Sequence, residues 1–306
     1  MKGLLSLSFL AQVVRISVPY VLAALGGTFC ERAGVINIAL EGFLLAGAFA
    51  AAAGCLAGGA LAGVALGVAA GCLLAALYGV AVIRWRADQI VCGVAITLLA
   101  GGATRFFLKL AFGSSSNSPR IAGIATPAWA TGGGLLGFLG ETLGSPLVVV
   151  TLFAVLAGDF VLFRTRFGLR LRAAGEHPEA AESLAVRVVP LRWAGVLLSG
   201  ALAGLGGVWL AYDQHGFVGG MSAGRGFIAL AAMILGGWTP RGATLACLLF
   251  GTAEALQLRL QSAASGGLGF GLGGGVIQAL PYAVTIFALA LRARRQLAPR
   301  ALGKPL

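Results

Sequence analysis

Residues 220–224 have the Gly-x-Ser-x-Gly spacing that places a nucleophilic serine on the tight turn of α/β hydrolases. Asp213, His177 and His215 are the residues that could complete a catalytic triad with Ser222. That motif needs a strand before its turn, and the surrounding sequence has no strand pattern. His215 also precedes the serine, whereas the histidine comes last in the triad order of that fold. We therefore do not expect hydrolase chemistry.

The sequence also lacks the elements of a nucleotide or metal site. Its nearest approach to a phosphate-binding loop is Gly303-Lys304, with Ala298 at the position of the first glycine and Pro305 in place of the serine or threonine. No group of His, Cys, Asp and Glu residues has the spacing of metal ligands, and the five cysteines are scattered through apolar surroundings. We expect a chain that is not an enzyme, does not hydrolyse ATP by itself and binds no cofactor or metal.

The polar residues with the strongest functional signal lie inside or beside long apolar runs. An ionisable group at membrane depth costs roughly 2.5–3.5 kcal/mol on the insertion scale, so such groups tend to face a bundle interior or a water-filled path. For Glu31 and Gln89, solvation at the membrane interface is an equally good explanation. The candidates are Glu31, Asn37, Glu41, Gln89, Asp213, Arg225, Glu254 and Gln257.

The composition indicates which kind of secondary structure holds these polar residues. Of the 306 residues, 58% are hydrophobic and only 10% are charged, and the mean hydropathy is +0.94. A soluble domain carries about 25% charged residues, and disordered chains are poor in apolar ones, so both classes are excluded. We predict an all-α, polytopic transmembrane helical bundle.

The charges divide the chain into about nine spans, with eight to ten as the range, at roughly 20 residues per crossing. The apolar stretch 42–83 contains no charge, so we expect two helices there, hinged near Gly58 and Gly59. The other expected spans are 16–30, 90–112, 146–163, 193–212, the short piece 227–238, 242–258 and 276–291.

The net charge of +12 is explained more simply by the positive-inside rule than by nucleic-acid binding, which we do not expect. With the 164–192 loop and the basic tail in the cytoplasm, nine spans place the N-terminus outside. About 15 of the 22 basic residues then lie on the inside.

An internal repeat supports this organisation. Residues 39–48 align without gaps to residues 223–232 with four identities in ten, and Leu-Gly-Gly occurs in the span before each copy. Glu41 and Arg225 occupy equivalent positions with opposite charge. Inverted repeats with glycine-interrupted segments are typical of transporters, although chance could produce this match in a chain so rich in alanine and glycine.

We therefore predict a single transmembrane domain over residues 1–306. Its repeat halves cover approximately residues 16–163 and 193–291, and a cytoplasmic loop, 164–192, joins them.

The 175–186 segment of that loop has the pattern of a short exposed helix. Pro178 suits the first turn, Glu179 and Glu182 suit the positive end, and Ala181, Leu184 and Ala185 form a small apolar face. The functional interpretation is a docking helix for a cytoplasmic partner; the alternative is a solvated connector.

Three blocks of sequence resemble the permease subunits of ATP-binding-cassette (ABC) importers, in the family of branched-chain amino acid, ribose and nucleoside permeases. They are residues 22–52, which contain ERAGVINIALEG, residues 167–185, which read FGLRLRAAGEHPEAAESLA, and residues 221–249; residues 87–99 match more weakly. The similarity is strongest to the nucleoside permeases that work with basic membrane lipoproteins. His177 and Thr97 stand where this family usually has asparagine, and the change at Thr97 alters a polar residue that would line the substrate path.

The resemblance implies a multi-pass protein of the bacterial inner membrane that moves nucleosides inward. It implies three partners: a separate ATPase that holds ATP and magnesium, a second related permease, in a heterodimer, and an extracytoplasmic binding protein. A ribose-like sugar or a branched-chain amino acid is the alternative cargo, and an ion-coupled secondary transporter is the alternative class. The implied substrate path comprises Asn37, Glu41, Phe43, Gln89, Thr97, Arg225 and Phe227, and the implied ATPase contact comprises Gly175, Glu176, His177, Pro178, Glu179, Ala180, Ala181 and Glu182.

Overall fold

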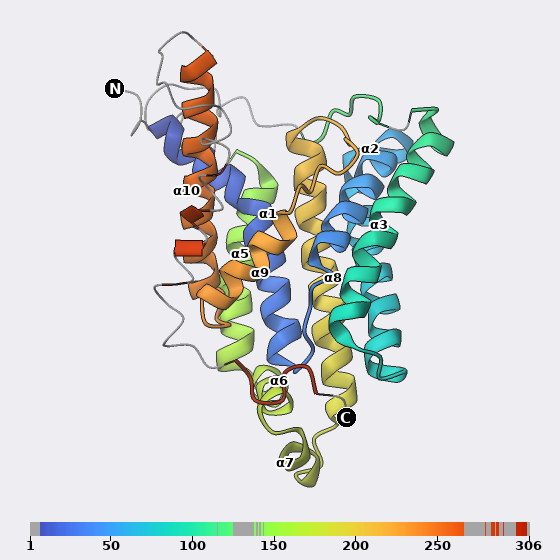
Figure 1. The fold of residues 1–306 in the computed structure, drawn as a ribbon, viewed down its shortest axis with the longest axis vertical. Coiled ribbons are helices and arrows are strands. Elements are labelled where there is room, and N and C mark those ends of the chain that lie inside the picture. Colours follow the sequence, from blue (N-terminus) through green and yellow to red (C-terminus); the bar gives the residue numbers. More distant parts are fainter. Residues whose placement is uncertain are drawn as a thin grey trace.

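The computed structural model describes residues 7–114, 116–124, 144–265 and 298–304, with a few single residues between 138 and 142 and between 279 and 290. The regular secondary structure of these residues is entirely helical, which confirms the predicted all-α class. Figure 1 shows the elements, which are α1 (Leu7–Arg32), α2 (Leu40–Gly79), η1 (Val80–Arg84), α3 (Gln89–Phe112), α5 (Pro146–Arg164), α6 (Arg166–Glu176), α7 (Pro178–Ser183), α8 (Val188–Asp213), α9 (Arg225–Leu235) and α10 (Pro240–Ser265).

Six helical stretches in the described residues are long and apolar enough to cross a membrane, and one of them, Leu40–Arg84, comprises α2 with its break and η1. Helix α9, with 11 residues, is too short to cross. The expected span 276–291 falls largely outside the described residues. The described part of the chain is thus built as a multi-pass bundle, while the number nine stays a prediction.

The first helix is longer than the expected span 16–30, because α1 runs through Arg15 without a break. The Arg15 guanidinium forms an ion pair with the Asp213 carboxylate at 2.6 Å, and both side chains are partly exposed. The helix therefore extends beyond the predicted apolar span, and the paired charge of Arg15 does not interrupt it.

Helix α2 is broken where the sequence predicts its hinge. Gly58 and Gly59 have non-helical angles, and the positive φ of Gly59, +82°, is a conformation that favours glycine. The Tyr212 hydroxyl donates to the Ala60 carbonyl at 2.5 Å and so fixes the hinge to the end of α8. The two parts of α2 therefore pack as two separate helices.

The centre of the bundle is the packing of α8 against α1 and α2. Glycines allow these backbones to approach closely: a Cβ built at Gly26 of α1 would lie 2.9 Å from the Ser199 carbonyl oxygen, and one at Gly204 would lie 2.7 Å from that of Gly67. Small residues at such crossings are typical of membrane helices, since close backbone contact replaces the hydrophobic driving force.

Two non-helical segments interrupt this centre. Residues 33–39 lead from α1 into α2, and residues 214–224 lead from α8 into α9. Figure 1 shows α9 lying obliquely within the bundle, whereas α6, α7 and the C-terminal tail lie together at one end, opposite the described start of α1.

Candidate functional site

The first turn of α2 meets the first turn of α9 inside the protein. The Glu41 carboxylate accepts hydrogen bonds from the backbone N–H groups of Gly224, at 2.8 Å, and Gly226, at 2.6 Å. Gly226 is required here, because a Cβ at this position would clash with the backbone N and Cα of Glu41. The N-terminal end of a helix carries partial positive charge. One buried carboxylate thus compensates the facing ends of both helices.

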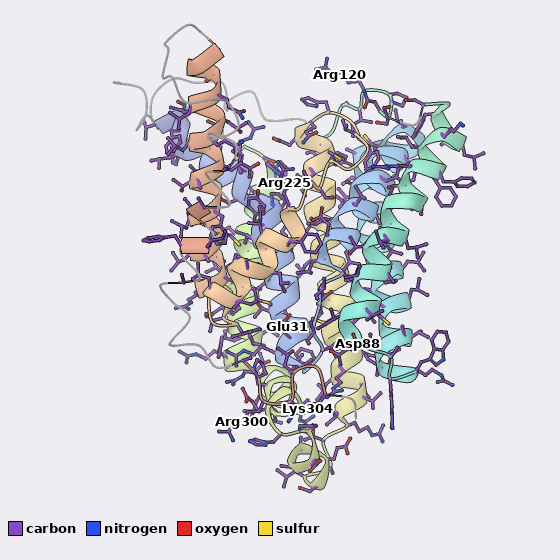
Figure 2. All side chains as sticks on the ribbon, in the orientation of Figure 1. Glu31, Asp88, Arg120, Arg225, Arg300 and Lys304 are labelled. Atoms are coloured by element: carbon purple, nitrogen blue, oxygen red, sulfur yellow. The ribbon has the colours of Figure 1, made fainter. Side chains whose placement is uncertain are left out.

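Arg225, the residue equivalent to Glu41 in the repeat, has a different partner. Its guanidinium forms an ion pair with Glu254 of α10 at 2.9 Å and donates to the Met221 carbonyl at 2.9 Å. Glu254 also accepts a hydrogen bond from the Tyr20 hydroxyl of α1. Arg225 lies at mid-height of the bundle in Figure 2. The charge on α9 is therefore compensated by α10, and the two predicted repeat residues do not pair with each other.

Asn37 is fully buried in the non-helical segment between α1 and α2. Its amide Nδ2 donates to the Ser199 hydroxyl of α8 at 2.5 Å, and its backbone N–H donates to Glu31 at 3.4 Å. The amide oxygen, Oδ1, is buried and has no hydrogen-bond partner in the described structure. A buried acceptor without a partner is uncommon and costs about 1–3 kcal/mol.

Gln89 braces the same segment from the start of α3. Its side-chain oxygen accepts from the Ile36 N–H at 2.8 Å, and the Tyr78 hydroxyl donates to the carbonyls of both Ile36 and Gln89. Gln89 is 6% exposed and Glu31 is 3% exposed. Both side chains are thus buried and hydrogen-bonded within the protein.

The remaining predicted path residues lie around the start of α2 and on α9. Phe43 is fully buried with its ring edge-on to Tyr78, and Thr97 donates to the Gly93 carbonyl of its own helix at 3.0 Å. Phe227 is 46% exposed on α9. The structure thus gathers Asn37, Glu41, Phe43, Gln89 and Thr97 around one segment and brings α9 to it through Gly226, with Phe227 on the exposed side.

The predicted docking loop forms two short helices, α6 and α7, that meet at His177. Glu179, Ala180 and Glu182 are exposed, and Ala181 packs in a small cluster with Ala174 and Val188. Helix α7 ends at Ser183, so Leu184, 78% exposed, and Ala185 do not share an apolar face with Ala181 as expected. The exposed helix itself agrees with the prediction.

The C-terminal tail, residues 298–304, is packed beside this loop. The Ala301 N–H donates to the Gly175 carbonyl at 2.9 Å, the Gly303 N–H donates to Gly34 at 3.2 Å, and Arg192 donates to the Lys304 carbonyl at 3.0 Å. Arg300 and Lys304 lie at this end in Figure 2, opposite Arg120. A cavity of about 360 Å³ separates the tail from α7 and is lined by Glu176, His177, Pro178, Glu179, Ala180, Arg300, Ala301 and Lys304.

Several residues of this site were missed by sequence reasoning. Tyr20, Trp238 and Ser199 each make one hydrogen bond to a polar side chain from a distant part of the chain. Aromatic and hydroxyl residues are common in membrane helices, so their types alone gave no signal. Arg32 was counted only as an inside charge, although it directly follows Glu31 in the block that carries the resemblance.

Interrupted helices with buried, paired charges inside a multi-pass bundle define a membrane protein of the transporter class. The comparisons with known proteins agree. The chain matches the family described as "Branched-chain amino acid transport system / permease component" over residues 9–289, and it belongs to this family. The predicted resemblance is thereby confirmed.

Individual relatives are similar over most of their length. The "Nucleoside ABC transporter permease protein NupC" of Lactococcus lactis is 37% identical, with 96% of this chain and 94% of the relative covered. The "Guanosine ABC transporter permease protein NupQ" of Bacillus subtilis is 39% identical, with 78% of each covered. A more distant one, the "Glucose ABC transporter permease protein TsgB13" of Haloferax volcanii, is 28% identical over 79% of this chain and 67% of the relative. No solved structure shows significant similarity.

Proposed function

We propose that this chain is one permease subunit of an ABC importer that moves nucleosides inward across the cytoplasmic (inner) membrane of a bacterium. The observation that carries the proposal is the similarity to permeases named for nucleosides and guanosine, at 37% and 39% identity over 96% and 78% of the chain. The chain itself supplies the path, and ATP with its magnesium binds to a separate subunit.

The charges at the junction of α2 and α9 support an uncharged cargo. In transporters, the N-termini of broken helices often point at an anionic group of the substrate. Here Glu41 supplies that negative group, and Glu254 neutralises Arg225. A branched-chain amino acid, whose carboxylate needs a positive partner, is therefore less well matched to this junction than a nucleoside.

Within the proposed path, the residues divide into two roles. Asn37 offers a buried acceptor to a hydroxyl or amino donor, and Phe227 offers an aromatic face to a nucleobase. Thr97 lies beside the start of α2, where its hydroxyl adds a polar group. Glu41, Phe43, Gln89 and Arg225 hold the interrupted helices in place.

A simple sugar is the second candidate cargo, favoured by the similarity to a permease named for glucose. A sugar is also uncharged and would suit the same compensated junction. It lacks a nucleobase, so it cannot form the base–ring stack that the exposed Phe227 would offer to a nucleoside. Competition between nucleosides and sugars therefore discriminates the two.

The proposed topology has nine spans, an outside N-terminus and two inverted halves, 16–163 and 193–291, in one permease domain. Its support is the equivalent build of the two halves, since α1 and α8 are each followed by a non-helical segment and then by a helix that begins inside the bundle. In this topology α1 and α8 cross the membrane in opposite directions. The contacts of Gly26 with Ser199 and of Gly195 with Phe29 fit such antiparallel packing.

The partners follow from the same proposal. An ATPase subunit contacts the segment from Gly175 to Glu182 through its exposed residues, a second related permease completes the membrane part as a heterodimer, and an extracytoplasmic binding protein delivers the cargo. The exposed position of α7 at one end of the bundle supports the ATPase contact.

Reconstitution in liposomes tests the energy source. With all partner subunits and the binding protein present, we expect nucleoside uptake that requires ATP inside the liposomes and is unaffected by proton or sodium gradients. Gradient-driven uptake by this chain alone would instead establish a secondary transporter, for which Glu41, Asp213 and Glu254 are the candidate coupling carboxylates.

A further inference from the structure

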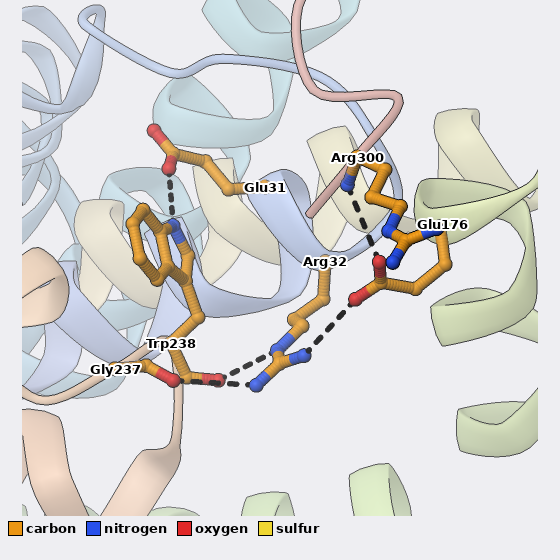
Figure 3. Close-up of polar contacts among 6 residues, drawn as sticks. All are labelled: Glu31, Arg32, Glu176, Gly237, Trp238 and Arg300. Carbon is orange, nitrogen blue, oxygen red and sulfur yellow. Dashed lines mark hydrogen bonds and ion pairs between the residues drawn. The ribbon is translucent and has the colours of Figure 1, made fainter. Parts of the chain in front are cut away.

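Arg32, the last residue of α1, connects three parts of the chain that are distant in sequence (Figure 3). Its guanidinium donates to the carbonyls of Trp238, at 2.8 Å, and Gly237, at 3.2 Å, in the turn that follows α9. The same group lies 3.7 Å from the Glu176 carboxylate at the end of α6. Glu176 in turn accepts from the Arg300 N–H of the tail at 3.3 Å.

Glu31, the residue before it, extends this network into the bundle. The Trp238 indole N–H donates to Glu31 at 2.6 Å, and the other oxygen of Glu31 accepts from the Asn37 N–H. Glu31 and Trp238 are 3% and 6% exposed. The turn after α9 is thus tied to the interrupted segment after α1 through one buried carboxylate.

Backbone packing reinforces the contact at the end of α6. Gly175 lies against the C-terminal end of α1. A Cβ at Gly175 would contact the Arg32 carbonyl oxygen and lie 3.1 Å from the Gly34 backbone nitrogen. A displacement of the 175–182 segment therefore acts directly on Arg32. The side-chain ion pair to Glu176, which is partly exposed, is the weaker part of this contact.

We infer that Arg32 and Trp238 are the positioning residues that transmit movement of the ATPase-contact segment, residues 175–182, to α9 and to the non-helical segment before α2. This inference rests on the proposed function, because it assigns a role to that segment in coupling. Arg32 transmits to the turn after α9, and Trp238 relays the same movement through Glu31 to Asn37. Coupling through a protein requires a contiguous set of contacts, and these residues form one from the loop to the path.

The alternative is that the network only stabilises the fold. The two roles differ in what fails when the network is cut. Loss of stability lowers the amount of assembled transporter, so ATP hydrolysis and uptake decline together. Loss of transmission leaves the ATPase subunits hydrolysing ATP while the path no longer responds.

The test measures both activities in the complete complex with its binding protein, using guanosine as the transported probe. Arg32→Ala removes all contacts of the guanidinium, and Trp238→Phe removes only the N–H donor while keeping a ring. We expect each to lower uptake per assembled complex by about 10- to 100-fold, within the range of coupling free energies, with ATP hydrolysis nearly unchanged. Arg84→Ala, which removes an exposed positive charge at the end of η1, is the matched control and should keep full uptake.

A double-mutant cycle adds a second measurement. If Arg32 and Glu176 act in one chain of contacts, Arg32→Ala combined with Glu176→Gln should lower uptake no further than Arg32→Ala alone. The inference would be overturned if Arg32→Ala and Trp238→Phe each lowered uptake and ATP hydrolysis to the same extent. Unchanged uptake in Arg32→Ala would also overturn it. Wild-type complex that hydrolyses ATP but takes up no nucleoside would instead overturn the proposed cargo, so the two failures are distinguishable.

Discussion

Replacing Glu41 with glutamine is expected to lower the free energy of unfolding by about 2–4 kcal/mol and to abolish transport. The carboxylate accepts two backbone hydrogen bonds at the start of α9, and glutamine can accept only one of them while its amino group faces the other donor. Buried donors without partners cost about 1–3 kcal/mol each, and the positive ends of two helices would also lose their compensating charge. Thermal unfolding in detergent and nucleoside uptake measure the two effects.

Asp159→Asn is the matched control, because it makes the same change in a carboxylate of α5. Asp159, whose side chain is 18% exposed, pairs at 2.9 Å with Arg241, whose side chain is 76% exposed. Because the positive partner is solvated, the pair contributes up to about 1 kcal/mol, and asparagine can still accept a hydrogen bond from Arg241, so this variant should stay close to wild type in both measurements. An equal effect of the two substitutions would show that Glu41 has no special role at the junction.

Deleting residues 179–182 is expected to abolish transport while the chain remains folded in the membrane. These residues form most of α7, which lies at the end of the bundle and has one buried side chain, Ala181. The deletion removes an exposed surface and very little of the core, so we expect an unchanged amount of protein in the membrane and uptake at background. Uptake and membrane content are measured on the same cells.

The double variant Glu179→Ala with Glu182→Ala, which has alanine at all four positions, provides the control for chain length. Alanine keeps the helix and the small residue at Ala181, so we expect this variant to retain measurable uptake. Full transport by the deletion variant would contradict the assignment of α7 to the ATPase contact.

The predicted features that the structure bears out depend on local chemistry. The hinge at Gly58 and Gly59 was predictable because paired glycines in an uncharged run of double length leave few other places for a break. The exposed helix α7 was predictable because Pro178 fixes its first turn. Both signals lie within a few residues of the feature they predict.

The partners of the buried charges were not predictable in this way. Glu41 and Arg225 were selected by their equivalent positions, but Gly226 and Glu254, their partners, depend on how α9 and α10 pack. Trp238 reaches Glu31 across 207 positions of sequence. A single sequence contains no record of such pairings, since they follow from helix packing and not from spacing.

The most direct test of the nucleoside assignment is uptake of radiolabelled purine and pyrimidine nucleosides by cells with and without this gene, in the presence of excess ribose or leucine. We predict that loss of the gene removes nucleoside uptake and that neither ribose nor leucine competes with the uptake of intact cells. Unchanged nucleoside uptake, with loss of ribose or leucine uptake instead, would contradict the assigned cargo.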